Sequence, residues 1–205
     1  MTGAIKGYPW NGGRTTTAEA STYIEPAVGA VRWAKVIDHT RCIGCHACST
    51  ACKSENQVPL SVHRTYVKYV DVGIYPSVRR AYQVTRCNQC QDPPCTHACP
   101  TAAMYQRDDG IVDFDKSICI GCKACIAACP YDARYIHTDG YADKCTFCLH
   151  RGDRGPACVE ACPTRSLTFG DLNDPRSDIA ALLRERQWKQ LHADAGTRPN
   201  LYFLI

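Results

Sequence analysis

Sixteen cysteines in four groups of four are the residues of this sequence best suited to chemistry. In chain order, the quartets are Cys42, Cys45, Cys48 and Cys52; Cys87, Cys90, Cys95 and Cys99; Cys119, Cys122, Cys125 and Cys129; and Cys145, Cys148, Cys158 and Cys162. The first and third quartets have the spacing C-x2-C-x2-C-x3-C, and the last three quartets are each followed by proline. Thiolates are soft metal ligands, so the spacing predicts metal centres.

The spacing is the one that bacterial ferredoxins use for cubane [4Fe–4S] clusters. Three thiolates on a tight loop reach three irons of one cluster, and the fourth cysteine faces a second cluster. Zinc sites use paired C-x2-C knuckles, and a third cysteine two residues further on has no use in a tetrahedral site. Disulfides are the other alternative, but C-x2-C pairs make poor structural bridges. Sixteen ligands, four per cubane, therefore predict four [4Fe–4S] clusters with all sixteen cysteines as iron ligands.

Composition agrees with a chain held together by metal centres. Leu, Ile, Val and Phe make up 37 of the 205 residues, which is 18%. This fraction is thin for a globular chain, but a formal net charge of only +4 argues against disorder. Bound clusters can replace part of an apolar core as internal cross-links. The charge forms no basic block, which excludes a typical nucleic-acid-binding protein.

The first twenty residues have no apolar stretch typical of a secretory signal, and no stretch of the chain has the roughly 20 apolar residues that span a bilayer. Residues 1–30 look like an irregular arm. Alternation predicts strands at 31–37, 66–71, 78–84, 111–114, 133–137 and 167–170, with a turn at 108–110. A helix is predicted from Ser177 to about His192. The apolar tail 201–205 is expected to dock on a partner.

The short hairpin between the second and third quartets favours pairing of these two in one ferredoxin unit. The first and fourth quartets would then pair outside it. Spacing alone also allows the first quartet to pair with the second and the third with the fourth. Basic residues beside the quartets would either offset cluster charge and raise reduction potentials, or be ordinary solvated surface charges. They are Lys53, Arg86, Lys116, Lys123, Lys144 and Arg165. His46 and His97 lie among the ligands but are expected to lie at the surface or to pack beside the ligands without binding iron, since no quartet lacks a cysteine.

The sequence resembles the electron-transfer β subunits of the dimethyl sulfoxide reductase superfamily of molybdoenzymes, and most of all the iron–sulfur subunits of polysulfide and thiosulfate reductases. The resemblance covers about residues 33–204. It rests on the stretches CIGCHACSTACKSENQVP, CNQCQDPPCTHACPTAAMYQRDDGIV, CIGCKACIAACPYDARYIH, KCTFCLHR, ACVEACPTRSLTFGDLNDP and GTRPNLYFL. Two departures are Lys53 in place of the usual proline and a short x9 loop in the fourth quartet.

The resemblance implies an α+β fold of two pseudo-symmetric ferredoxin-like units, one inserted in the other. The outer unit would comprise 31–84 and 131–172, the inserted unit 85–130, and the C-terminal helix and tail 173–205. It also implies nested ligand sets: Cys42, Cys45, Cys48 with Cys162; Cys145, Cys148, Cys158 with Cys52; Cys87, Cys90, Cys95 with Cys129; and Cys119, Cys122, Cys125 with Cys99. Some relatives lack a cysteine in the third quartet, but Cys122 is present here.

By the same resemblance, the protein is expected to relay electrons between a molybdenum- or tungsten-bis(pyranopterin) catalytic subunit and a quinone-reactive membrane subunit. It would have no catalytic residues and no small-molecule substrate of its own, and its partners would hold it at the periplasmic or cytoplasmic face of a membrane. Two alternatives are an equivalent subunit of a hydrogenase or formate dehydrogenase, and a free polyferredoxin. The arm, the helix and the apolar tail argue against a freely diffusing carrier.

Overall fold

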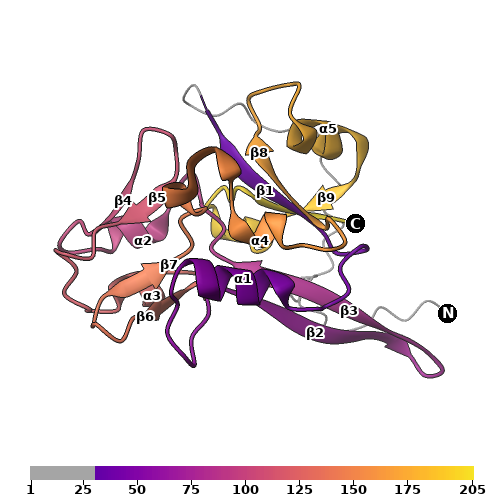
Figure 1. Cartoon of the computed structure of the whole chain (residues 1–205), viewed down its shortest axis with the longest axis horizontal. Helices are drawn as coiled ribbons and strands as arrows, with labels where there is room; N and C mark the ends of the chain where they lie inside the picture. The colour runs from indigo at the N-terminus through magenta and orange to yellow at the C-terminus, as the bar shows by residue number, and fades with distance from the viewer. Residues whose placement is uncertain (1–30) are drawn as a thin grey trace.

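The computed structural model describes residues 31–205, and the predicted arm 1–30 lies outside them. A four-stranded sheet with one covering helix forms one end of the molecule, and three two-stranded hairpins with short helices form the rest (Figure 1). The strands of the four-stranded sheet are β1 (Trp33–Asp38), β8 (Leu167–Asp171), β9 (Trp188–Lys189) and β10 (Leu201–Leu204), in the order β8-β1-β10-β9. Strand β1 is parallel to β10 and antiparallel to β8.

Side-chain alternation gives this sheet two different faces. Ala34 and Val36 of β1 pack with Tyr202 and Leu204 of β10 against helix α5 (Asp178–Glu185). On the other face, Ile37, Leu201 and Phe203 pack against the helices and hairpins that carry the cysteines. Because strand side chains alternate, Lys35 lies on the same face as Ile37. The sheet thus separates a mainly apolar layer from the cysteine-rich layer.

Three antiparallel hairpins make up the remaining strands of the described residues. The longest joins β2 (Thr65–Ile74) to β3 (Ser77–Arg86) and extends away from the body of the molecule (Figure 1). The two shorter ones are β4 (Met104–Gln106) with β5 (Val112–Phe114), and β6 (Arg134–Ile136) with β7 (Ala142–Lys144). The short helices are α1 (Ala47–Glu55), α2 (Pro94–His97), α3 (Ala124–Ala127) and α4 (Ala157–Glu160), with 3-10 turns η2 (Leu149–Arg154) and η3 (Ala193–Ala195).

The strand predictions are confirmed to within a few residues, but two C-terminal predictions are wrong. Helix α5 begins after its predicted cap, where Ser177 Oγ accepts a hydrogen bond from the Ala180 amide, but ends at Glu185. Arg186 is already extended, because the following Trp188 pairs with β10 and packs edge-on against Tyr202 at 4.9 Å. The tail is not a free docking segment: it is β10, a fully buried inner strand of the protein's own sheet.

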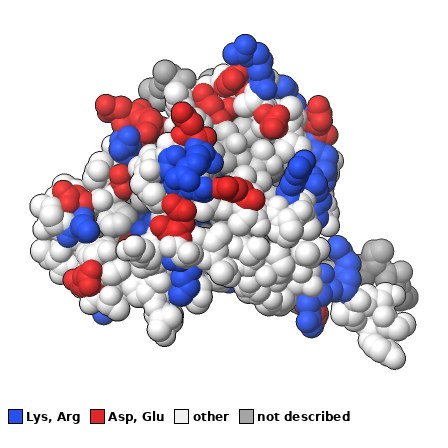
Figure 2. All heavy atoms as spheres, in the orientation of Figure 1, with Lys and Arg blue, Asp and Glu red and all other residues white. Residues whose placement is uncertain are grey.

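Charged side chains of both signs are interspersed over the face shown in Figure 2, in agreement with the absence of a basic block from the sequence. Within residues 31–205, no helix is both long and apolar enough to cross a membrane.

Candidate iron–sulfur centres

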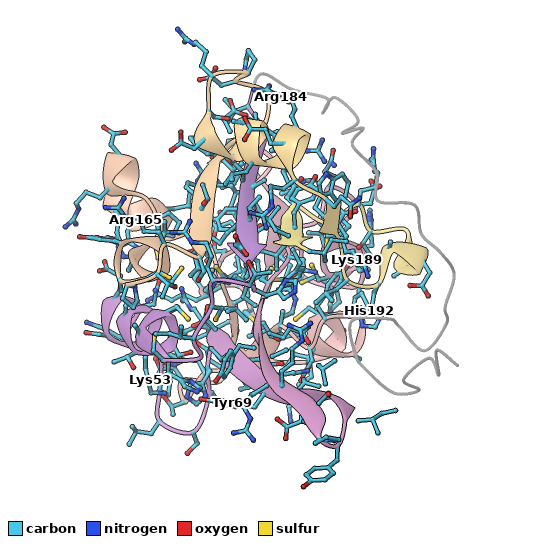
Figure 3. The ribbon with its side chains drawn as sticks, turned by 90° about the vertical axis from the view of Figure 1, so that its right-hand side faces the viewer. Lys53, Tyr69, Arg165, Arg184, Lys189 and His192 are labelled. Atoms are coloured by element: carbon cyan, nitrogen blue, oxygen red, sulfur yellow. The ribbon has the colours of Figure 1, made fainter. Side chains whose placement is uncertain are left out.

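Each quartet places its third cysteine on one of the four short helices. Cys48, Cys95, Cys125 and Cys158 lie on α1, α2, α3 and α4, and all four side chains are buried. The sulfur atoms gather in the interior between the helices and the sheet (Figure 3). All sixteen cysteines lie within the described residues, and none of them forms a disulfide there.

The loops before the helices come in two alternating forms. In the first and third quartets, a left-handed residue (His46 or Lys123) precedes the helix, and a positive-φ glycine lies two residues earlier. Gly44 and Gly121 have φ angles of 69° and 67°, a region that glycine enters without steric cost. In the second and fourth quartets, an extended proline precedes the helix. The loop form therefore repeats in every second quartet.

Two cavities are lined by four cysteines each. The first has Cys42, Cys45 and Cys48 on its wall, together with Cys162 from a segment more than a hundred residues later in the sequence. The second has Cys87, Cys90, Cys95 and Cys129 on its wall. In each case three cysteines come from one quartet and the fourth comes from another.

The other eight cysteines are near one another in two further groups. Burial, followed by the negative charges of Cys145 and Cys158, raises the pKa of Cys52 to about 12. Burial also raises the pKa of Cys125, and the neighbouring thiols Cys119, Cys99 and Cys122 raise it further. Crowded, buried thiols with raised pKa values resist ionisation unless a cationic metal core replaces their protons.

Two buried cations donate hydrogen bonds to the sulfur of Cys158. Arg86 Nη1 lies 2.9 Å and Lys35 Nζ 3.3 Å from Cys158 Sγ, and both side chains are 0% exposed. Burial opposes ionisation of this thiol, but the charges of Arg86 and Lys35 outweigh it and lower the pKa of Cys158 to about 6. A third buried cation, Arg134, donates to Cys95 Sγ.

Several of these buried N–H donors have no acceptor among residues 31–205. They are Nε and Nη2 of Arg86 and Nε of Arg134. A buried donor without a partner costs free energy, so a site of this kind calls for an acceptor that the polypeptide does not provide. An iron–sulfur cluster, which presents sulfide acceptors and net negative charge when bound by four thiolates, fits this donor set.

Only part of the predicted basic set points toward the sulfurs. Arg86 and Lys144 are fully buried, and Lys144 Nζ donates to backbone carbonyls, including Cys145 O at 2.7 Å. Lys53 Nζ instead donates to Pro59 O and Val62 O, and it lies with Arg165 at the edge of the molecule in Figure 3. Lys116 and Lys123 are exposed.

Sequence reasoning missed Lys35 and Arg134. The available signal for Lys35 was its position in a strand, where alternation places it on the same face as Ile37. His46 contacts the hydroxyl of Tyr69.

Comparison with known proteins agrees with this geometry. A 4Fe-4S dicluster domain model matches residues 78–172, and a 4Fe-4S binding domain model matches residues 39–61. The sequence is 44% identical to a tetrathionate reductase subunit of Salmonella typhimurium, over 84% of this sequence and 72% of that protein. It is 42% identical to a polysulfide reductase chain of Wolinella succinogenes, over 85% and 95%, and 44% identical to the NrfC protein of Escherichia coli, over 85% and 81%.

This protein belongs to the iron–sulfur subunits of the dimethyl sulfoxide reductase family. The subunit is therefore an electron-transfer component of a reductase complex and not a catalytic subunit. Its fold is a mixed α/β arrangement that contains ferredoxin-like 4Fe-4S domains, as the cysteine spacing predicts.

Proposed function

We propose that the subunit holds four [4Fe–4S] clusters in nested ligand sets. The sets are Cys42, Cys45, Cys48 and Cys162; Cys52, Cys145, Cys148 and Cys158; Cys87, Cys90, Cys95 and Cys129; and Cys99, Cys119, Cys122 and Cys125. The observation that carries this proposal is the cavity whose wall joins Cys162 to three cysteines of the first quartet. The second cavity and the two further groups of neighbouring thiols support the remaining sets.

The same contacts support two pseudo-symmetric units, with 85–130 inserted between 31–84 and 131–172. The alternating loop forms before α1 to α4 are the main argument for the symmetry. Ala142 of β7 packs with Cys95, Met104 and Cys125, so the hairpin after residue 130 lies against the inserted unit.

In function, the subunit relays electrons between a molybdenum- or tungsten-bis(pyranopterin) catalytic subunit and a quinone-reactive membrane subunit. Bound [4Fe–4S] clusters supply one-electron oxidation and reduction at iron. The protein's own residues keep the sites dry: Cys87, Cys90, Cys145 and Cys148 are each less than 9% exposed. Cys45 and Cys122 are exposed instead, and Ile43 and Ile120 beside them are 57% and 67% exposed. These two loops are suitable places for electrons to enter and leave.

The test is an activity comparison in the purified complex. A Cys45→Ser variant should lose turnover driven by quinol, because the relay is broken. It should retain turnover driven by a reduced viologen dye that delivers electrons to the catalytic subunit directly. The unmodified subunit should contain about sixteen iron atoms, four for each cubane.

Two results would contradict the proposal. An iron content near eight would mean that half of the quartets hold no cluster. Full quinol-driven turnover in the Cys45→Ser variant, after electron paramagnetic resonance has shown its cluster to be lost, would mean that the electrons bypass this subunit.

A further inference from the structure

Cys158 is surrounded by buried positive charge. Lys35 enters from β1 and Arg86 from the end of β3, so two strands far apart in the sequence place cations on one sulfur. The Lys35 ammonium also lies 5.0 Å from the ring centre of Phe147 and 5.7 Å from that of Phe169. Aromatic rings on one side and a thiol on the other leave this ammonium without water.

Burying two cations side by side is costly unless negative charge compensates them. Hydrogen bonds to Cys158 use one N–H of Arg86, while its Nε and Nη2 have no acceptor among residues 31–205. A cluster held by Cys158 would provide both the compensating charge and acceptors for these donors. The site therefore has more positive charge than a single thiolate requires.

Sulfur atoms in the other proposed sets accept hydrogen bonds from neutral donors, except at Cys95, and none of them has two cationic donors. Cys162 Sγ lies 3.2 Å from the Ser166 hydroxyl, and Cys99 Sγ lies 3.7 Å from the Thr101 hydroxyl. Cys119 Sγ accepts from the backbone amide of Ala142 at 3.4 Å. Cys95 has one cationic donor, Arg134. Charge-assisted hydrogen bonds are roughly twice as strong as neutral ones, so Cys158 has the most stabilising environment for added negative charge.

We propose that Lys35 and Arg86 set the reduction potential of the cluster held by Cys158 and make it the highest of the four. This inference rests on the proposed function. Reduction adds one electron and one negative charge to that site, and a neighbouring cluster that gives up the electron is oxidised in turn. Buried cations stabilise the extra charge, so electrons within the subunit collect at this position before they move on.

A redox titration of the intact complex, followed by electron paramagnetic resonance, tests the proposal. Lys35→Met keeps most of the length of the side chain and removes its charge. It should lower the midpoint of one signal so that, at the original midpoint potential, the ratio of reduced to oxidised cluster falls about tenfold, which corresponds to about 59 mV. In the unmodified complex, that signal should be the one with the highest midpoint, and Cys52→Ser should alter it.

Two further variants keep the result interpretable. Arg86→Gln should also lower the midpoint, and Arg86→Lys should restore most of it. If Arg86→Gln does not fold, Lys35→Met still decides the matter. Arg165→Gln is the matched control, because Arg165 is exposed beside the fourth quartet and should move no midpoint.

Unchanged midpoints in a Lys35→Met complex that retains all its iron would overturn the inference and leave the four-cluster relay standing. A shifted signal that is not the highest of the four would also overturn it. Failure of the proposed function would be a different result: the unmodified complex would contain too little iron for four clusters. That measurement is made before any variant is tested.

Discussion

Arg64 Nη2 lies 2.8 Å from Asp143 Oδ1 and connects the segment before β2 to strand β7. The two side chains are only 10% and 2% exposed, and Tyr135 donates its hydroxyl to the same carboxylate. Removing one partner would leave the other charge buried and unpaired, at a cost of about 3–5 kcal/mol. We expect Arg64→Met to lower the thermal unfolding midpoint of the cluster-loaded protein by roughly 10 °C.

The matched control for this ion pair is Arg80 with Asp71, whose side chains are 57% and 56% exposed. Exposed pairs contribute little to stability because water and salt screen them, so Arg80→Met should shift the midpoint by less than about 4 °C. Equal shifts in the two variants would mean that burial of the Arg64–Asp143 pair contributes nothing to stability.

The C-terminal strand β10 should be essential for folding. Phe203 is 0% exposed, and Phe203→Ala should cost about 3–5 kcal/mol of unfolding free energy. Ile205, which follows the strand and is 38% exposed, offers a control: Ile205→Ala should stay within about 0.5 kcal/mol. Soluble yield and thermal unfolding of the two variants provide the measurement. A stable, cluster-loaded protein lacking residues 201–205 would show that the sheet does not need its inner strand.

Cluster binding by the third quartet should require a glycine at position 121. An alanine Cβ at this position would lie 2.4 Å from the Gly140 carbonyl oxygen, and the residue has a φ of 67°. Gly110 has a φ of 78° but open space around it, so Gly110→Ala incurs only the conformational cost of a left-handed alanine, about 1–2 kcal/mol. Gly121→Ala should therefore weaken one electron paramagnetic resonance signal while Gly110→Ala leaves all four. Intact signals in both variants would mean that the loop containing Gly121 does not closely approach the loop containing Gly140.

Cysteine variants distinguish nested from sequential pairing. In the nested arrangement, Cys42→Ser and Cys162→Ser should delete or alter the same electron paramagnetic resonance signal, although the residues are 120 positions apart. The double variant should add little, because the effects of residues that act as a unit are non-additive. Cys125→Ser should change a different signal. If Cys42→Ser and Cys99→Ser remove a common signal instead, the pairing is sequential.

Local patterns in the sequence were sufficient to predict the chemistry of this protein and several of its secondary-structure elements. Short-range spacing of cysteines predicted iron–sulfur chemistry, because a cluster-binding loop is built from a few consecutive residues. Alternation and turn residues predicted the β2–β3 and β4–β5 hairpins, whose strands are neighbours in the sequence. Ser177 also marked the start of α5 through a local hydrogen bond.

Tertiary structure decided the features that depend on distant partners. The role of the tail follows from pairing of β10 with β1, residues more than 160 positions apart that no local pattern relates. The early end of α5 follows from pairing of Trp188 with β10. Arg86 was recognised as a basic residue next to a quartet, but its acceptor is Cys158 of another quartet. Lys35 looks like an ordinary strand residue until the sheet is assembled. Only the assembled sheet and helices bring its charge to Cys158 and exclude the water that would otherwise screen it.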